Sequence, residues 1–192
     1  MGDKAFILIC SMEFFTILPL IYMAGTFKAM GMQLGRLDDF TLTLIASCGN
    51  IANGLCRIFW GALNDKVDFK FLYRLILLVE FVLCASMVRV VESSPYLYFV
   101  WIFLAYSCLG GHFVLFPLVM MKAYGQKTGG RLASFLYTSK GLSSLLGLVL
   151  AQGFSNYFGI DAYMWMYWLS CLLVLISAAI KELIFEPEMR KR

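Results

Sequence analysis

The chain has 192 residues, of which 61% are hydrophobic and only 15% are charged. Soluble domains are typically about 45 to 50% apolar and about 25% charged. A chain of this length cannot bury so much apolar surface in one core, so the composition excludes a soluble globular domain and predicts a membrane protein. Collagen-like and disordered chains are excluded by the high apolar content. The net charge of +4 gives no indication of nucleic-acid binding.

Six apolar runs are long enough to cross a bilayer as helices, which takes about 20 residues each. They are 5–27, 40–63, 71–91, 96–121, 132–155 and 162–184, with short connections. Membrane β-strands are about ten residues long and alternate with period two, and these runs do neither. We therefore predict an all-α integral membrane protein, with residues 1–192 forming a single six-helix transmembrane bundle. The six cysteines lie inside these runs and are expected to be free thiols.

The basic residues are divided unevenly between the two sides of the predicted bundle. With an even number of spans both termini lie on one side, and that side holds 11 of the 16 Lys and Arg residues. The opposite side holds only Lys28, Arg36 and Arg89. The excess of positive charge on cytoplasmic loops predicts that both termini face the cytoplasm, or the equivalent side of an organelle. Which membrane contains the protein is left open.

Two cations, Arg57 and Lys140, fall in the middle of spans. A cation at that depth costs about 2.5 to 3.5 kcal/mol even on the lenient insertion scale, so such residues usually face a bundle interior or a watery cavity. Arg57 lies eight residues before Asp65 and Lys140 lies eight residues after Leu132, on antiparallel helices. At 1.5 Å per residue each is about 12 Å from the cytoplasmic end. At one depth, the two cations can close on a single anion.

Small and polar residues lie on the same helix faces as these cations. Asn53 precedes Arg57 by four residues, and Tyr137 precedes Lys140 by three. Close helix packing is the alternative explanation for the small residues of both faces. With the cations, we expect Asn53 and Tyr137 to line a substrate site.

Three further ionisable residues lie inside spans. Glu13 and Glu80 are the candidate intramembrane partners, and either could pair with Arg57 in a structural salt bridge. Desolvation could instead keep Glu80 protonated. A structural or interface role is favoured for Glu80, while proton coupling is an open alternative. His112 is expected to lie at the substrate site, as a packed, hydrogen-bonded residue rather than a proton relay.

The loop after the second run contains Gly61, Asp65 and Lys66, in the sequence RIFWGALNDKVDFK. In this loop Asp65 is expected to hold a helix N-terminus and Lys66 to anchor at the interface. The loop resembles the G-x-L-x-D-[RK] loop of the major facilitator superfamily, which suggests a cytoplasmic gate. The segments NGLCRIFWG (53–61) and GGHFVLFPLVMMKAYGQKTGGRLASFLYTSKG (110–141) are similar to the oxalate/formate antiporter branch.

The resemblance implies a C-terminal half, helices seven to twelve, built as two inverted three-helix repeats, without the family's N-terminal half. It implies that the anion-binding Arg and Lys of that branch fall on Arg57 and Lys140. Aromatic residues that enclose substrate fall near Leu109 and Phe113, and Leu109 departs from that pattern. The implied function is alternating-access exchange of small organic anions, such as mono- or dicarboxylates like oxalate or formate.

Two kinds of protein fit the sequence. The first is a transporter half that works with a complementary six-helix half, from the same gene or a separate chain, rather than as a homodimer. The second is a non-transporting accessory subunit or fragment derived from a transporter. An enzyme is not expected, because no nucleophile with a base, phosphate loop or metal site is recognisable. The expected partners are a small carboxylate, the lipid bilayer and the complementary half, with no cofactor, metal or nucleic acid.

Overall fold

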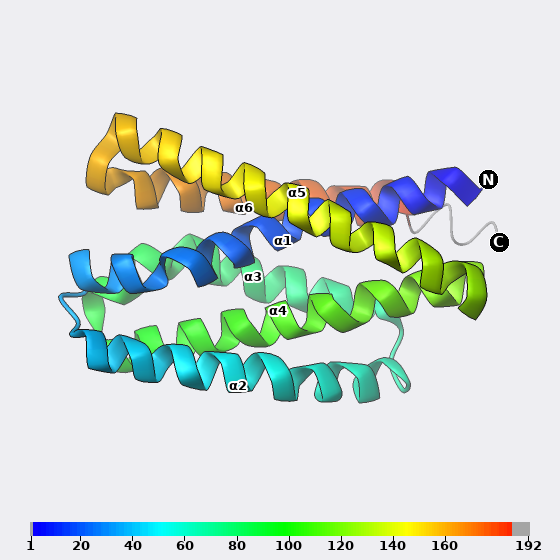
Figure 1. The fold of residues 1–192 in the computed structure, drawn as a ribbon, viewed down its shortest axis with the longest axis horizontal. Helices are drawn as coiled ribbons and strands as arrows, with labels where there is room; N and C mark the ends of the chain where they lie inside the picture. The colour runs from blue at the N-terminus through cyan, green and yellow to red at the C-terminus, as the bar shows by residue number, and fades with distance from the viewer. Residues whose placement is uncertain (1, 186–192) are drawn as a thin grey trace.

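The structure is a computed structural model that describes residues 2–185, and that range contains helices and no strands (Figure 1). The all-α prediction is confirmed. The elements are α1 (Gly2–Gln33), α2 (Asp39–Asn64), α3 (Phe69–Ser93), α4 (Pro95–Tyr124), α5 (Gln126–Phe158), the 3-10 helix η1 (Gly159–Asp161), α6 (Ala162–Ile180) and the π-helical turn η2 (Lys181–Phe185).

Five continuous helical segments are long and apolar enough to cross a membrane. They are Lys4–Gln33, Asp39–Asn64, Phe69–Ser93, Pro95–Tyr124 and Gln126–Phe185. The last one contains α5, η1, α6 and η2, so the expected runs 132–155 and 162–184 fall in one continuous helical segment. The chain nevertheless reverses direction at η1, where Gly159 has a positive φ of 58° (Figure 1). Glycine reaches this backbone conformation without steric cost.

Aspartates begin two of the helices. The carboxylate of Asp38 accepts hydrogen bonds from the Thr41 hydroxyl at 2.6 Å and the Thr41 amide at 3.1 Å. These bonds hold the pKa of Asp38 below its usual value. The N-cap of α3 is Asp68, whose side chain accepts from the Lys70 amide. Asp65 was expected to hold a helix N-terminus, but it is the C-cap residue of α2. Helix α3 begins at Phe69, so the aspartate directly before it, Asp68, occupies the capping position.

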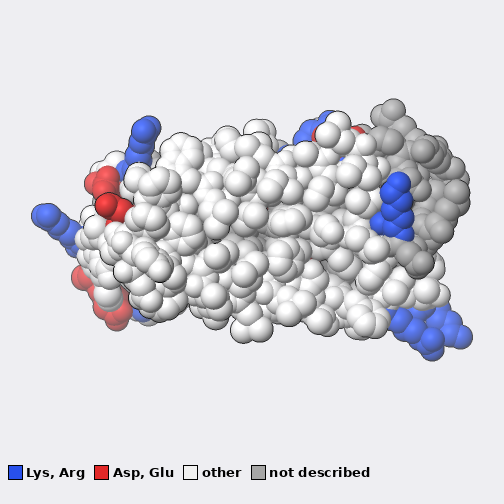
Figure 2. All heavy atoms as spheres, turned by 90° about the horizontal axis from the view of Figure 1, so that it is seen from above, with Lys and Arg blue, Asp and Glu red and all other residues white. Residues whose placement is uncertain are grey.

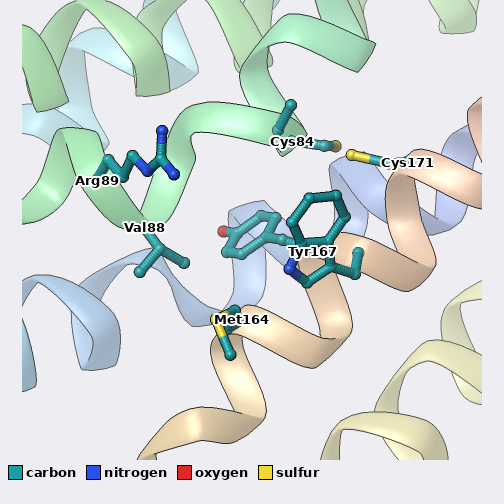
Figure 3. Close-up of a pocket in the computed structure, with 8 residues that line it drawn as sticks. Cys84, Val88, Arg89, Met164, Tyr167 and Cys171 are labelled. Atoms are coloured by element: carbon teal, nitrogen blue, oxygen red, sulfur yellow. The ribbon is translucent and has the colours of Figure 1, made fainter.

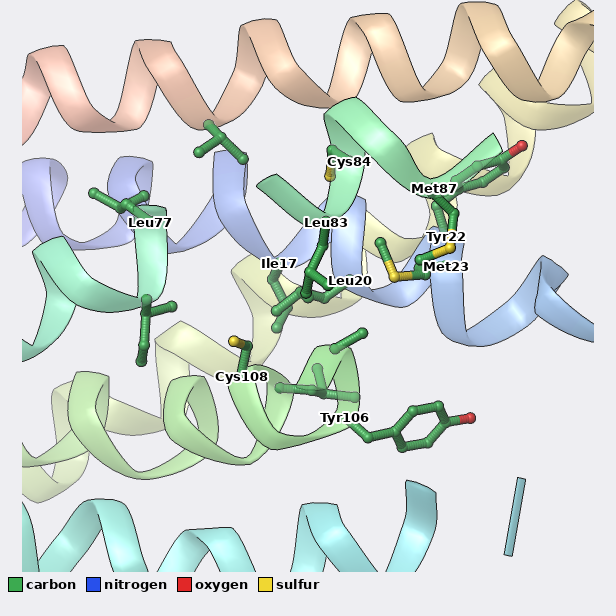
Figure 4. Close-up of a cluster of buried hydrophobic side chains, with 14 of the residues drawn as sticks. Ile17, Leu20, Tyr22, Met23, Leu77, Leu83, Cys84, Met87, Tyr106 and Cys108 are labelled. Carbon is green, nitrogen blue, oxygen red and sulfur yellow. The ribbon is translucent and has the colours of Figure 1, made fainter. Parts of the chain in front are cut away.

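Helix α4 is the central element of the bundle. It packs against α1, α2, α3 and α5, while α6 packs against α1 and α3 (Figure 1). The core between these helices is made of aliphatic, aromatic and sulfur-containing side chains (Figure 4). Ile17, Leu20 and Met23 from α1 meet Leu83 and Met87 from α3 there. Core positions on α4 include Tyr106 and Cys108.

The contact between α2 and α4 depends on two glycines. A Cβ at Gly110 would lie 2.7 Å from the carbonyl oxygen of Asn53, and a Cβ at Gly111 would lie 3.1 Å from the indole nitrogen of Trp60, both on α2. Trp60 of α2 donates from its indole nitrogen to the Ser107 carbonyl of α4 at 3.0 Å. Small residues of this kind let membrane helices approach closely, and the Trp60 bond joins the two helices nearby.

Charged side chains gather at the two ends of the molecule, and the middle of the visible face carries none (Figure 2). The end where α1 begins and η2 lies holds most described cations, including Lys66, Lys122, Lys127 and Arg131. The opposite end holds Lys28, Arg36 and Arg89. On this face, the charge-free band between the ends is the pattern that a bilayer requires.

Replacing Gly110 by Ala is expected to destabilise the bundle by about 1 to 3 kcal/mol, because the new methyl group would force α2 away from α4. Thermal unfolding of the purified protein in detergent measures the effect. Gly54→Ala is the matched control, since a Cβ at Gly54 meets nothing within 4 Å and Ala favours the helix by up to about 1 kcal/mol. Equal unfolding temperatures for the two variants would contradict the close-contact explanation.

Candidate functional site

Arg57 and Lys140 both contact the aromatic ring of Phe113. The guanidinium carbon of Arg57 lies 4.6 Å from the ring centroid, and the Lys140 ammonium nitrogen lies 4.2 Å from it. The three residues come from α2, α4 and α5, and α4 packs against both other helices. Each contact is a cation–π interaction within the effective range of about 6 Å. Two cations from separate helices therefore meet at one ring.

Arg57 is exposed, and no described carboxylate forms an ion pair with it. Its Nε donates to the Asn53 side-chain oxygen at 3.3 Å, one turn earlier on α2. A Cβ at Gly54 of α2 or at Gly141 of α5 would meet nothing within 4 Å, so both helices leave open space next to the cations. The terminal nitrogens of the guanidinium are available to an incoming anion.

Lys140 is 5% exposed and forms an ion pair with Glu13 of α1, with Nζ 2.8 Å from Oε1. Its ammonium also donates to the His112 carbonyl at 3.4 Å and lies 4.9 Å from the Tyr137 ring centroid. The expectation that Glu13 could pair with Arg57 is therefore wrong. α1 packs against α5, and this places Glu13 within reach of Lys140. Lys140 is thus a compensated cation, whereas Arg57 is not.

The charge network continues from Glu13 to His112 and Glu80. His112 Nδ1 lies 3.1 Å from Glu13 Oε2, and His112 Nε2 lies 2.5 Å from Glu80 Oε1. All three side chains are fully buried. The imidazole stacks on Phe116 at 5.3 Å and meets the Tyr73 ring edge-on at 6.1 Å. Lys140, Glu13, His112 and Glu80, here called the buried charge network, therefore connect α5, α1, α4 and α3.

Two serines of α5 fasten this helix to α1 on both sides of Glu13. Ser139 donates to the Cys10 carbonyl at 3.3 Å, and Ser143 donates to the Phe14 carbonyl at 2.7 Å. Hydroxyl groups often join membrane helices in this way. The serines flank Lys140 by one and three residues, so they hold its backbone at the level of the Glu13 carboxylate.

The structure divides the predicted site residues into three groups. Asn53, Phe113 and Tyr137 lie with Arg57 and Lys140, and the Phe113 and Tyr137 rings stack at 6.4 Å. His112 lies behind this group, with both ring nitrogens occupied by carboxylates. Gly61, Asp65 and Lys66 lie at and just beyond the end of α2, where Asp65 and Lys66 are exposed. Leu109 is buried in the core.

The pairing of Glu13 with Lys140 was not anticipated from the sequence. Both residues lie near the middle of long apolar helices, and comparing the depth of Glu13 with that of Lys140 would have suggested the pair. Within residues 2–185 no group of three or more His, Cys, Asp or Glu side chains is placed to hold a metal ion. Glu13 and Glu80 contact opposite nitrogens of the His112 ring, so the three groups do not converge on one point.

A separate pocket lies between α3 and α6 (Figure 3). Its wall is mainly apolar, with Arg89 as the one charged residue among those that line it; the others are Cys84, Ala85, Val88, Met164, Tyr167, Trp168 and Cys171. None of these residues belongs to the Arg57 cluster or to the buried charge network. The cluster that combines cations with hydrogen-bond acceptors is therefore the one around Phe113.

Replacing Lys140 by Met is expected to destabilise the protein by about 3 to 5 kcal/mol, because the buried Glu13 carboxylate would lose its cation. Combining it with Glu13→Gln should recover part of that loss, since the uncompensated charge is then removed. Chemical unfolding of the four proteins of this cycle measures the coupling. Lys127→Met, the same change at an exposed position of α5, should have little effect. Additive effects of the two buried substitutions would contradict the ion pair.

Known proteins are similar in sequence to most of this chain. The sequence model of the Major Facilitator Superfamily matches residues 5–192. The chain is 24% identical over 132 residues to the oxalate:formate antiporter of Oxalobacter formigenes, covering 69% of this chain and 30% of that protein. It is 26% identical over 161 residues to apicoplast pyruvate carrier 1 of Toxoplasma gondii, covering 81% of this chain and 28% of that protein. The chain therefore matches less than a third of the length of these relatives. It belongs to the Major Facilitator Superfamily, whose members are transporters, and is an integral, multi-pass membrane protein.

Proposed function

We propose that this chain forms the substrate-binding half of a secondary transporter for small carboxylates. The observation that carries the proposal is the meeting of Arg57 and Lys140 at the Phe113 ring, with Arg57 exposed and unpaired by any described carboxylate. An unpaired cation inside a membrane segment is costly unless an anion or water compensates it. A small anion that enters the site supplies that compensation.

The residues of the site have distinct roles in this proposal. Arg57 binds one carboxylate group through two parallel N–H donors, the geometry in which a guanidinium recognises a carboxylate. Lys140 contributes a second positive charge, and Asn53 orients the guanidinium. The rings of Phe113 and Tyr137 form the apolar wall. The similarity to an oxalate:formate antiporter and a pyruvate carrier supports small organic acids as the substrates.

In this proposal, alternating access uses two three-helix repeats that together make six membrane crossings. Helix packing supports the repeats, because exchanging α1, α2 and α3 with α4, α5 and α6 reproduces two pairs of large helix contacts. α2 packs on α4 as α5 packs on α1, and α3 packs on α4 as α6 packs on α1. Inverted repeats of this kind place substrate near the middle of the bilayer. Arg57 and Lys140 lie on the equivalent helices α2 and α5.

The remaining parts of the mechanism are assigned by position. The basic end of the bundle faces the cytoplasm in this proposal, with both termini on that side. The loop with Gly61, Asp65 and Lys66 lies at that end and acts as a gate. A complementary six-helix half covers the open side of the anion site and rocks against this chain, which exchanges one carboxylate for another.

Replacing Arg57 by Gln is expected to lower carboxylate uptake at least tenfold, because the loss of one charge-assisted bond to a carboxylate is worth about 1.5 to 3 kcal/mol. Uptake of radiolabelled oxalate, formate and pyruvate into proteoliposomes that contain the complete transport assembly measures it. Arg57→Lys should retain part of the activity, since it keeps the charge and loses the two-pronged geometry.

The control is Arg131→Gln, which removes an exposed arginine near the beginning of α5, outside the site. It should transport like the unchanged protein. Wild-type uptake by the Arg57→Gln variant would refute the anion site, and an absence of carboxylate uptake by the unchanged assembly would favour an accessory role.

A further inference from the structure

The hydrogen bonds of His112 require a proton in the buried charge network. A neutral imidazole carries one N–H and can donate to only one acceptor. Both nitrogens of His112 nevertheless lie within hydrogen-bond distance of carboxylate oxygens, Glu13 Oε2 at 3.1 Å and Glu80 Oε1 at 2.5 Å. Either the imidazole carries a second proton, or one carboxylic acid carries it. In each case the three groups hold one proton more than a neutral histidine and two carboxylates would.

The environment of Glu80 favours retention of that proton. Glu80 is fully buried, and its Oε2 has no hydrogen-bond partner among the described residues. A charged carboxylate with one unsolvated oxygen is strongly disfavoured in an apolar interior. A shared proton on the His112–Glu80 contact removes this charge, so the arrangement with both short contacts is the proton-bound form.

The charges of the anion site and of the network balance only in particular states. Arg57 and Lys140 contribute two positive charges, and Glu13 and Glu80 contribute two negative charges when His112 is neutral. Without the extra proton and without substrate, the sum is zero. With the proton alone the sum is plus one, and with a monovalent anion alone it is minus one. With both it is zero again.

We propose that Glu13, His112 and Glu80 form a proton-binding site, linked through Lys140 to the anion site, so that one proton binds together with one monocarboxylate. The proposal rests on the carboxylate transport proposed above and specifies its substrate charge and coupling ion. The link is direct, because Lys140 contacts both Phe113 of the anion site and Glu13 of the network. A carboxylate that attracts the ammonium weakens its hold on Glu13, and a protonated His112 then compensates Glu13.

Other titratable groups border the network on every side. The ordinary titration ranges of Tyr and Cys begin at about pH 8.5 or higher, and histidine is the side chain that ordinarily changes charge between about pH 5 and 8. The titratable groups that border the network are Cys10 of α1 beside Glu13, Cys56 and Arg57 of α2, Tyr73 and Cys84 of α3, Cys108 of α4, Tyr137 of α5, and Cys171 of α6 beside Cys84. The dependence of carboxylate binding on pH near neutrality is therefore assigned to the shared proton of Glu13, His112 and Glu80.

The proposal predicts the direction in which substrate affinity changes with pH. Lower pH fills the proton site, and the proton-bound site carries the positive charge that a monocarboxylate neutralises. Affinity for pyruvate, used as the monocarboxylate probe, should therefore fall as pH rises, by up to about tenfold per pH unit for one linked proton. Exchange of one carboxylate for another moves no net proton, whereas net uptake carries one. Oxalate, used as the dicarboxylate probe, leaves the occupied site with excess negative charge and should bind more weakly.

Glu80→Gln tests the proton site. The amide can donate to His112 Nε2 while His112 Nδ1 donates to Glu13, so every contact is satisfied without the extra proton. This variant should bind pyruvate at all pH values about as tightly as the unchanged assembly does at acidic pH. Glu92→Gln is the matched control, because it makes the same change at an exposed position of the same helix. The control should keep the pH dependence.

Isothermal titration calorimetry on the purified complete assembly, between about pH 5.5 and 8, provides the affinities. A pH-sensitive dye in weakly buffered solution should report about one proton taken up for each pyruvate bound by the unchanged protein. This second measurement tests the proposal even if Glu80→Gln does not fold.

Three outcomes would overturn the proposal. Pyruvate affinity that is constant with pH, or pyruvate binding without proton uptake, removes the proton linkage and leaves the carboxylate site intact. A Glu80→Gln variant with the wild-type pH dependence shows that the proton resides elsewhere. Failure of the unchanged assembly to bind any carboxylate at any pH overturns the proposed function as well, and this result is distinguishable from the first two.

Discussion

The buried charge network is the constraint on which the rest of the structure depends. Lys140, Glu13, His112 and Glu80 join four helices in the buried interior of the bundle, where one uncompensated charge would cost several kcal/mol. Apolar side chains tolerate small shifts between neighbouring helices. Charged groups tolerate such shifts poorly, because a charge is compensated only while it stays in contact with its partner. The network therefore fixes the depth of α1, α3 and α5 relative to α4 more strictly than the surrounding core does.

This fixed arrangement separates the roles of the two intramembrane cations. The network holds Lys140 at the inner side of Phe113, and Glu13 already balances its charge. Arg57 approaches the same ring from α2, where Asn53 supports it and open space lies beside it. An anion that enters the site meets Arg57 as an unpaired charge and Lys140 as a shared one. In the proposed mechanism, the contact with Arg57 supplies most of the attraction, and the contact with Lys140 transmits binding to the buried charge network.

The sequence predicts the helices and the two cations well for definite physical reasons. Apolar runs of more than 20 residues have few alternatives to membrane helices, and counting along antiparallel helices places Arg57 and Lys140 at one depth. The partner of Lys140 depends on which helices touch, and Glu13 is 127 residues away along the chain. Pairing of Arg57 with Glu13 or Glu80 was as consistent with the sequence. The capping of α3 by Asp68 instead of Asp65 depends on the exact residue at which α3 begins.

Net charge also limits which states of the site can close. A bundle that closes around its site excludes water, so the sum of the charges inside must be near zero. The empty form without the shared proton meets this condition, and so does the form that holds one proton and one monocarboxylate. The two singly occupied forms carry a full charge and must stay open to water. In the proposed mechanism, proton and anion then cross together even though they bind to different groups, because closure responds to the sum of their charges. Under this proposal, coupling requires no moving part beyond the proposed rocking of two halves, since the charges of Arg57, Lys140, Glu13 and Glu80 already determine which states can move.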